Sequence, residues 1–228
     1  MQNRLGENLA EVKRRIERAA RKCGRDSSEI KLVAVSKTHP AETLREAMAA
    51  GANVFGENKV REAEGKIEVL GSENLEWHLI GHLQSNKARK AVKLFDVIHT
   101  LDSIELARRL ERICVEENRA SLLVLIEVDL AGEATKSGIG EADLPYLIEF
   151  LKTCERLKFD GLMIIPPFLE DVEKVRPYFR KLCEIRDELI PHGELSMGMS
   201  HDFETAIEEG ATIVRVGTAI FGERENLP

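Results

Sequence analysis

Eight short apolar segments recur along the chain, and stretches with helical periodicity separate them. In chain order they are residues 32–37, 53–57, 77–82, 97–101, 122–129, 161–165, 195–200 and 212–216. Strands that are apolar throughout and alternate with helices pair in parallel, because the helices then cover both faces of the sheet. Eight such units predict an α/β fold, a closed (β/α)8 TIM barrel, rather than an open doubly wound sheet.

The stretches between these strands have the apolar spacing of amphipathic helices. One stripe comprises Ile104, Ala107, Leu110 and Cys114, and similar stripes run through residues 144–154 and 172–189. A further stripe precedes the first strand, and its members are Leu5, Leu9, Val12, Ile16 and Ala19. We expect this additional N-terminal helix to lie outside the eight units, as a lid or as a cap on the bottom of the barrel.

Local signals predict several helix ends, but none divides the chain into domains. Pro40 is expected in the first turn of a helix that Gly51 ends, and Asp102 with Glu105 is expected to cap another helix. No Pro-, Ser- or Gly-rich linker interrupts the 228 residues. A single barrel domain spanning residues 1–228 is therefore expected, since barrels of this length commonly form one domain.

The charge balance argues against several classes of partner. With 33 basic and 40 acidic residues the net charge is −7, which argues against binding of nucleic acid or of an anionic membrane. The basic run at residues 87–93 is better explained as the solvated face of a helix. No apolar stretch is long enough to span a membrane, the N-terminus lacks the apolar region of a signal peptide, and the four cysteines form no C-x-x-C pair. These features predict a soluble, cytoplasmic protein with reduced thiols.

A lone lysine closes the first apolar segment. Strand alternation puts Lys37 on the same face as Val33 and Val35. The active groups of a barrel gather where strands run into the loops that follow them. An amine at such a buried strand end loses hydration, which generally lowers its pKa and lets it attack a carbonyl. The alternative is a lysine that only extends its amine into solvent from a strand end.

The last two predicted strands end in small residues that suit an anion. Ser200 closes the seventh apolar segment, and Gly217 and Thr218 follow Arg215 at the end of the eighth. In barrels, the loops after these two strands commonly bind phosphate through free backbone N–H groups. Ordinary tight turns are the alternative, because serine and glycine suit them equally well. A reactive amine and a phosphate cradle together indicate a phosphorylated aldehyde, with pyridoxal 5′-phosphate (PLP) the first candidate.

Two histidines and one loop permit more than one interpretation. His78 and His82 lie four residues apart, but the segment is a predicted strand without a matching third ligand, so no metal site is expected. His82 either contacts a cofactor ring or satisfies polar groups at the barrel mouth. The loop at residues 132–138 is either a mobile active-site loop or an exposed surface loop. Glycine-rich nucleotide-binding motifs are missing from the sequence.

Seven ordered motifs extend over essentially the whole chain. They are Val33-Ala-Val-Ser-Lys37, Phe55-Gly-Glu-Asn58, Trp77-His-Leu-Ile-Gly-His-Leu-Gln-Ser-Asn-Lys87, Lys136-Ser-Gly138, Gly161-Leu-Met163, Leu195-Ser-Met-Gly-Met-Ser200 and Val214-Arg-Val-Gly-Thr-Ala-Ile-Phe-Gly222. This set resembles the pyridoxal phosphate homeostasis proteins, a family of single-domain, alanine-racemase-like barrels. The resemblance implies a PLP-binding barrel like that of the fold-type III PLP enzymes, with an additional N-terminal helix.

The resemblance also implies roles for individual residues, although it assigns no firm catalytic residue. Lys37 would hold PLP as a Schiff base, Ser200, Gly217 and Thr218 would hold the phosphate, Arg215 would face the pyridine nitrogen, and Asn58 and His82 would line the ring pocket. A permanent cation beside the ring nitrogen disfavours its protonation, which weakens the cofactor as an electron sink. Such a site suits restrained proton chemistry, or merely holding the cofactor.

The choice between enzyme and carrier depends on a second base. The related racemases use the cofactor lysine and a tyrosine that a second domain of a partner subunit supplies. We expect no such domain here, and Tyr146 and Tyr178 fall in predicted outer helices. The favoured hypothesis is a monomeric PLP-binding protein of vitamin B6, amino-acid and keto-acid homeostasis, without clear turnover, that hands PLP to apo PLP-dependent enzymes. The alternatives are a PLP-dependent racemase-like enzyme and a lysine Schiff-base aldolase acting on a phosphorylated sugar.

Overall fold

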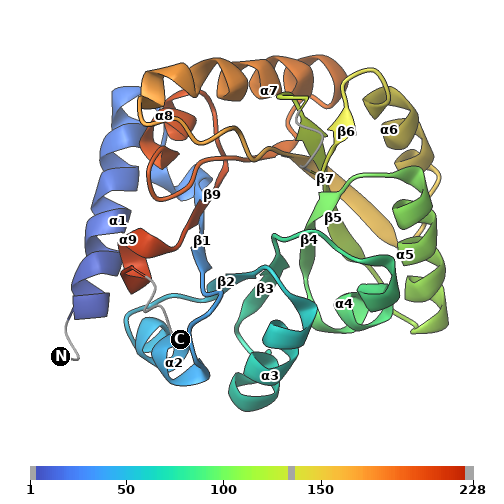
Figure 1. Ribbon diagram of the computed structural model, residues 1–228, viewed down its shortest axis with the longest axis horizontal. Coiled ribbons are helices and arrows are strands. Elements are labelled where there is room, and N and C mark those ends of the chain that lie inside the picture. The colour runs from blue at the N-terminus through green and yellow to red at the C-terminus, as the bar shows by residue number, and fades with distance from the viewer. Residues whose placement is uncertain (1–3, 133–136, 224–228) are drawn as a thin grey trace.

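A computed structural model describes residues 4–132 and 137–223, whose strands form a closed parallel barrel (Figure 1). The barrel strands are β1 (Lys31–Val35), β2 (Val54–Glu57), β3 (Glu76–Leu79), β4 (Val97–Leu101), β5 (Leu122–Asp129), β7 (Leu157–Met163), β8 (Glu194–Ser196) and β9 (Ile213–Val216). Their order is β4-β3-β2-β1-β9-β8-β7-β5, and pairing of β4 with β5 closes the ring. All neighbours are parallel. The predicted TIM barrel is confirmed.

Several details of the strands differ from the prediction. Strands β3 and β8 end at Leu79 and Ser196, earlier than the predicted residues 82 and 200. A short additional strand, β6 (Ile139–Gly140), pairs with the end of β5 and takes no part in closing the barrel. Strand β7 begins at Leu157, ahead of the predicted segment that started at Gly161. The polar Lys158 and Asp160 interrupt the apolar run there, which hid the first half of this strand.

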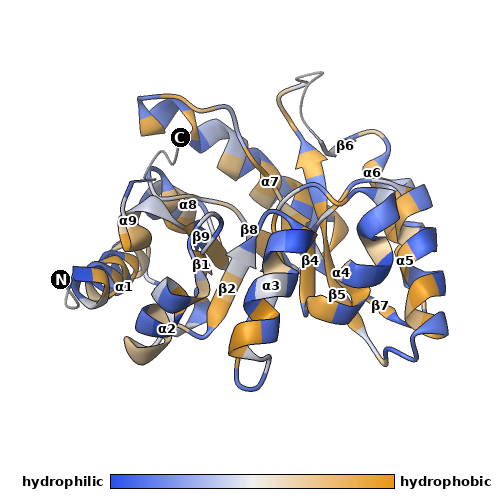
Figure 2. Ribbon diagram, turned by 60° about the horizontal axis from the view of Figure 1, so that its bottom comes forward, coloured by the Kyte–Doolittle hydropathy of each residue, from blue (hydrophilic) through white to orange (hydrophobic). Residues whose placement is uncertain are grey.

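Helices cover the outside of the barrel (Figure 1). They are α1 (Arg4–Lys22), α2 (Ala41–Ala49), α3 (Val60–Leu70), α4 (Ala88–Leu94), α5 (Ile104–Glu116), α6 (Leu144–Lys152), α7 (Arg176–Leu189), α8 (Phe203–Glu208) and α9 (Thr218–Phe221), with short 3-10 helices at Ser27–Glu29, Ser85–Lys87 and Val172–Lys174. Hydrophobic residues concentrate on the strands, and hydrophilic residues on the outward faces of the surrounding helices (Figure 2). Among the described helices, none is long and apolar enough to cross a membrane.

The N-terminal helix α1 lies on the side of the barrel, against α2, α8 and α9 (Figure 1). Its predicted apolar stripe is buried, since Leu9 and Val12 are each 1% exposed and Ile16 is 4% exposed. The expectation that this helix forms a lid or a bottom cap is therefore wrong. The stripe predicted which face of the helix is buried, but it carried no information on the surface that receives it.

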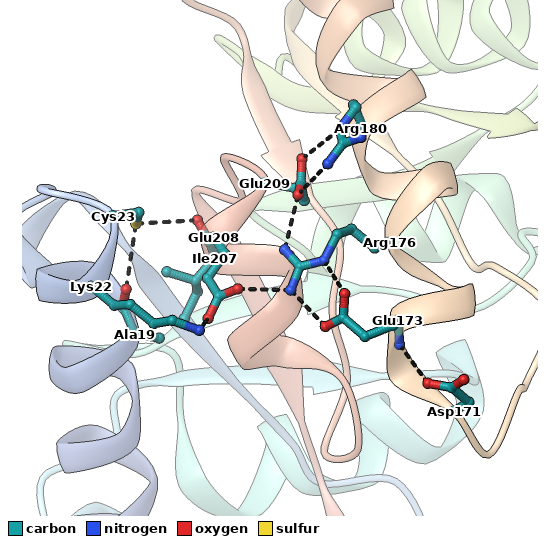
Figure 3. Close-up of polar contacts among 10 residues, drawn as sticks. All are labelled: Ala19, Lys22, Cys23, Asp171, Glu173, Arg176, Arg180, Ile207, Glu208 and Glu209. Atoms are coloured by element: carbon teal, nitrogen blue, oxygen red, sulfur yellow. Dashed lines mark hydrogen bonds and ion pairs between the residues drawn. The ribbon is translucent and has the colours of Figure 1, made fainter.

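Ion pairs join the end of α1 to α7 and α8 on the outside of the barrel (Figure 3). Arg176 contacts Glu208 at 2.8 Å and Glu209 at 2.9 Å. Lys22 contacts the other oxygen of Glu208 at 2.6 Å. Because several charges share partners and Arg176 is largely buried, this network stabilises the packing of α1 more than an isolated surface pair does.

The inside of the barrel is partly apolar and partly polar. A small cluster of Val33, Val97, Leu125, Met163 and Ile213 faces inward. Registered neighbours in a parallel sheet point to the same face. Arg215 pairs with Val33, His78 with Val97 and Ser196 with Met163, so these three polar side chains also face inward.

The predicted end of α2 holds, but Pro40 is its N-cap and not a residue of its first turn, and the predicted cap of α5 is wrong. Pro40 directly precedes α2, and Gly51 follows it with φ of 90°, a conformation that suits glycine. The N-cap of α5 is Ser103 rather than Asp102, because the Ser103 hydroxyl oxygen accepts a hydrogen bond from the Leu106 N–H at 3.3 Å. Asp102 instead accepts a hydrogen bond from that hydroxyl at 3.2 Å.

Candidate functional site

The predicted site residues occupy one arc of the barrel mouth. The carboxyl ends of parallel strands lie on the same side, and β8, β9, β1, β2 and β3 are consecutive neighbours. Ser200 follows β8, Arg215 lies on β9 with Gly217 and Thr218 after it, Lys37 follows β1, Asn58 follows β2, and His82 follows β3. Residues from distant parts of the sequence therefore meet around half of the barrel rim.

Polar contacts hold the backbone on both sides of Lys37, which is half-buried just beyond β1. On one side, the Ser36 carbonyl accepts a hydrogen bond from Lys66 Nζ at 2.8 Å. On the other side, the Thr38 N–H donates to a carboxylate oxygen of Glu62. Thr38 has a φ of 72°, which non-glycine residues rarely adopt. Because Lys66 and Glu62 both belong to α3, this helix fixes the main chain at Lys37.

Lys66 also neutralises a buried carboxylate. Lys66 Nζ lies 2.6 Å from Glu57 Oε1 and 2.7 Å from Glu62 Oε1. The Ser36 hydroxyl also donates to Glu57 at 2.6 Å. Burial raises the pKa of Glu57, and the Lys66 cation opposes that rise. The sequence indicated Glu57 as a strand-end residue within a motif, and nothing in it indicated Lys66.

Arg215 is 4% exposed and lies inside the barrel. Its Nη1 donates to the Ser196 hydroxyl at 2.6 Å, and its Nη2 donates to the Ile164 carbonyl at 2.8 Å. Burial lowers the pKa of Arg215 to about 10, and the nearby Glu127 opposes that change. The guanidinium therefore remains charged at neutral pH and is held in a fixed orientation from two sides.

Glu127 is an ionisable group near Arg215 that the sequence did not indicate. Glu127 on β5 is 5% exposed, and its Oε2 has no hydrogen-bond partner among the described residues. Burial raises the pKa of Glu127 to about 7, the negative charge of Asp102 adds to the rise, and Arg215 opposes it. Glu127 therefore changes its charge in the neutral pH range.

We expect Glu127→Gln to stabilise the protein at alkaline pH. The pKa of Glu127 is about 7 in the fold against an ordinary value of 4.5, so the folded state binds the proton more tightly than the unfolded chain. Wild-type stability therefore falls as the pH rises from about 4.5 through about 7, by at most about 3 kcal/mol. Urea unfolding of both proteins without added ligand should show a larger gain for the variant at about pH 8 than at about pH 5. An equal gain at both pH values would contradict this assignment.

Small residues form a compact turn where β8 and β9 end. The Ser200 hydroxyl oxygen accepts hydrogen bonds from the Gly217 N–H at 3.1 Å and from the Ala219 N–H at 3.3 Å. Because both bonds use the oxygen as acceptor, the hydroxyl proton is left to donate elsewhere. A Cβ added at Gly217 would lie 3.3 Å from the Val35 carbonyl oxygen, so this turn is packed against the end of β1. Thr218 is exposed at the start of α9. The phosphate site expected here stays a prediction, and the Gly217 and Ala219 N–H groups already donate to Ser200.

Asn58 and His82 lie on the β2–β3 side of the mouth. A Cβ added at Gly81 would lie 2.4 Å from the Asn58 carbonyl oxygen, so glycine is required where these two loops approach. His82 is about half exposed; its Nδ1 lies 3.1 Å from Ser137 Oγ and 3.5 Å from Asp102 Oδ2. His82 therefore contacts polar groups at the mouth, and both of its interpretations stay predictions. Residues 133–136 of the neighbouring loop lie outside the described residues, so both interpretations of that loop stay predictions.

His78 pairs with a histidine of another strand and not with His82. Its Nδ1 lies 2.7 Å from Nε2 of His99 on β4, and its Nε2 lies 2.8 Å from a carboxylate oxygen of Glu76. Within residues 4–132 and 137–223, no group of His, Cys, Asp and Glu side chains could hold a metal ion. The sequence spacing singled out His78 and His82, but the hydrogen-bond partner of His78 is His99 on the neighbouring strand.

Comparison with known proteins relates nearly the whole chain to one family. Residues 8–225 match the alanine racemase, N-terminal domain family. The pyridoxal phosphate homeostasis protein of Aquifex aeolicus is 48% identical over 96% of this chain and 98% of that protein. The protein of the same name from Escherichia coli is 42% identical over 98% of both chains.

Solved structures show the same relationship. PipY from Synechococcus elongatus PCC7942, solved with PLP bound, has a TM-score of 0.82 and 40% identity, covering 96% of this chain and 100% of that one. Alanine racemase from Corynebacterium glutamicum has a TM-score of 0.69 and 17% identity, and the match covers 100% of this chain but 64% of that one. The racemase comparison concerns the fold alone, and it agrees with the predicted alanine-racemase-like barrel.

Proposed function

This chain belongs to the pyridoxal phosphate homeostasis protein family, and on that premise we propose that it binds PLP at the mouth of its barrel. Lys37 holds the cofactor as a Schiff base, for which its amine condenses with the aldehyde and water leaves. Ser200, Gly217 and Thr218 hold the phosphate, Arg215 faces the ring nitrogen, and Asn58 and His82 line the ring. The protein holds PLP without clear turnover, and it serves the balance of vitamin B6, amino acids and keto acids as a monomer that supplies apo PLP-dependent enzymes.

The observation that carries this proposal is the meeting of three chemical groups on adjacent strands. Lys37 follows β1, Arg215 lies inside on β9, and the turn around Ser200 joins the ends of β8 and β9. An amine, a fixed cation and an anion cradle match the aldehyde, the ring nitrogen and the phosphate of PLP. The family resemblance supports PLP over the phosphorylated sugar of an aldolase, since a relative was solved with PLP bound.

The charge of Arg215 favours holding the cofactor over using it. Bound PLP supplies an electron sink whose strength depends on a protonated ring nitrogen. The pKa of Arg215 is lowered by burial only to about 10, so the guanidinium stays positive at neutral pH. A positive group facing the ring nitrogen raises the cost of protonating it. This supports a carrier.

A PLP-dependent racemase-like enzyme remains the second candidate, because the barrel has the racemase fold. A two-base mechanism needs an acid–base group opposite Lys37. Both tyrosines of the chain lie on outer helices, Tyr146 on α6 with 69% exposure and Tyr178 on α7. Exchange of the amino-acid α-proton in heavy water by PLP-loaded protein would favour the enzyme, and retention of that proton would favour the carrier.

The proposed site should bind PLP about 100-fold more tightly than pyridoxal, which carries the same aldehyde but no phosphate. Two charge-assisted hydrogen bonds at the Ser200 turn would account for a difference of that order. Absorption titrations of the purified protein with each ligand measure both affinities. Equal affinities would reject the phosphate cradle, and no spectral change with either ligand would reject the PLP site as a whole.

A further inference from the structure

A chain of hydrogen-bonded side chains crosses the inside of the barrel. It begins at Arg215 on β9 and ends at Glu76, the first residue of β3, at the opposite end of the barrel from the mouth. The successive contacts are Arg215 Nη1 to Ser196 Oγ at 2.6 Å, Ser196 Oγ to His99 Nδ1 at 2.9 Å, His99 Nε2 to His78 Nδ1 at 2.7 Å, and His78 Nε2 to Glu76 Oε1 at 2.8 Å. The three middle members are fully buried. We refer to this chain as the relay.

The Arg215 end leaves two arrangements open. An arginine can only donate, so the Ser196 oxygen is the acceptor in the first bond. That oxygen has two lone pairs, so Ser196 either donates its proton to Nδ1 of His99 or accepts a second hydrogen bond from that nitrogen. The direction of the remaining bonds therefore depends on the other end of the relay.

The Glu76 end decides between the two arrangements. Glu76 accepts hydrogen bonds from His78 and from Lys31 Nζ, the latter at 2.7 Å. The His78 hydrogen bond is the main reason that the pKa of Glu76 falls to about 2, so Glu76 is a carboxylate and can only accept. His78 must then donate through Nε2, which leaves its Nδ1 to accept from His99. A neutral His99 that donates through Nε2 accepts from the Ser196 hydroxyl at Nδ1, so the Glu76 end assigns the Nε2–H tautomer to both histidines.

Both imidazoles are neutral in this arrangement. Burial is the main cause that lowers the pKa of His78 and of His99, and the carboxylate of Glu76 opposes it only at His78. The other charges acting on the two rings are Lys31, Asp96 and Arg215. With neutral rings, every donor in the relay points away from the mouth and every link is satisfied.

We infer that His78, His99 and Ser196 are positioning residues for Arg215, and that they fix its guanidinium for the ring nitrogen of the cofactor. This inference rests on the proposed function, in which Arg215 faces that nitrogen. The relay turns the Ser196 hydroxyl so that its lone pair faces Arg215. Without His99 as acceptor, the hydroxyl proton could turn toward the guanidinium and oppose the cation.

Packing alone does not require these polar side chains. The neighbouring interior positions are apolar, among them Val97 beside His78 and Met163 beside Ser196. Burying two imidazoles and a hydroxyl is costly unless each polar atom has a partner. The fold keeps them, fully paired, in a line that ends at the one buried cation proposed to contact the cofactor.

The tautomers can be tested without the cofactor, by nitrogen-15 NMR of the protein labelled in histidine. The relay predicts that two of the histidine rings are neutral and protonated on Nε2 between about pH 6 and about pH 8. Loss of one of these two signal sets in His78→Gln, and of the other in His99→Gln, assigns them. Protonation of either ring in that pH range, or an Nδ1–H tautomer at either ring, would overturn the relay.

The link to the cofactor is tested with Ser196→Ala, which removes only the hydroxyl between Arg215 and His99. We expect PLP affinity to fall about tenfold, as for loss of one hydrogen bond to a charged group, with a shifted absorption maximum of bound PLP. Glu76→Gln, at the far end of the relay, should weaken PLP binding in the same direction. Its matched control is Glu73→Gln, which removes an exposed charge from the loop just before β3 and should have no effect.

The outcomes separate this inference from the function on which it rests. A wild-type protein that binds no PLP overturns the proposed function and the cofactor role of the relay together. Wild-type PLP binding that is unchanged in both affinity and absorption maximum in Ser196→Ala overturns the relay alone. Equal effects of Glu76→Gln and Glu73→Gln would also overturn it, because the response would then follow net charge and not the hydrogen-bonded path.

Discussion

Lys37→Ala is expected to remove completely the visible absorption band that PLP forms with the wild-type protein. That band requires a Schiff base in conjugation with the cofactor ring, and alanine supplies no amine to form it. PLP then binds only through its phosphate and ring contacts. The measurement is an absorption spectrum of each purified protein with and without added PLP.

The Lys37 variant should fold, so that loss of the band can be interpreted. The contacts that hold the main chain beside it involve the Ser36 carbonyl and the Thr38 N–H, and neither uses the Lys37 side chain. Lys59→Ala is the matched control, because Lys59 is exposed and immediately follows Asn58 at the same mouth. If the band persists in Lys37→Ala and disappears in Lys59→Ala, the Schiff base forms on Lys59, and our assignment to Lys37 is wrong.

The sequence predicted the strands well wherever burial left an uninterrupted apolar run. The bounds of β4 and β5 agree with the predicted 97–101 and 122–129, because helices cover their outer faces and the barrel interior covers their inner ones. The first half of β7 was missed because Lys158 and Asp160 break its run. The location of α1 was missed because an amphipathic stripe indicates a buried face but not the surface that covers it.

The sequence indicated candidate site residues at strand ends, but it did not indicate the residues that contact them from elsewhere. Lys37 and Arg215 could be found because the carboxyl ends of barrel strands have one common location. Lys66 could not be found, because a helix residue that reaches a strand end does so only through tertiary packing. His99 was overlooked because its partner His78 lies on the neighbouring strand; two histidines within consecutive buried strands were the available signal.

Lys66→Met is expected to destabilise the fold by about 3–5 kcal/mol at about pH 8, the range found when one partner of a buried ion pair is removed. Lys66 is largely buried, and its Nζ is bonded to Glu57, Glu62 and the Ser36 carbonyl. Methionine fills the volume of the aliphatic chain but provides no cation for Glu57, which is 0% exposed. Urea unfolding at equilibrium measures the loss.

The pH dependence of that loss identifies Glu57 as its cause. Burial already raises the pKa of Glu57, and the Lys66 cation is the main force that opposes the rise, so the variant should raise this pKa further. A protein that contains a carboxyl group with a raised pKa in the folded state loses stability as the pH rises through that pKa, so the Lys66→Met variant should be least impaired in acid.

The double variant Lys66→Met/Glu57→Gln should recover much of the stability at about pH 8, since it leaves no buried charge. Lys90→Met, which breaks only an exposed pair with Glu64, should be nearly neutral. If the double variant is no more stable than Lys66→Met, the buried carboxylate is not what Lys66 stabilises, and the fixed main chain at Lys37 must have another origin.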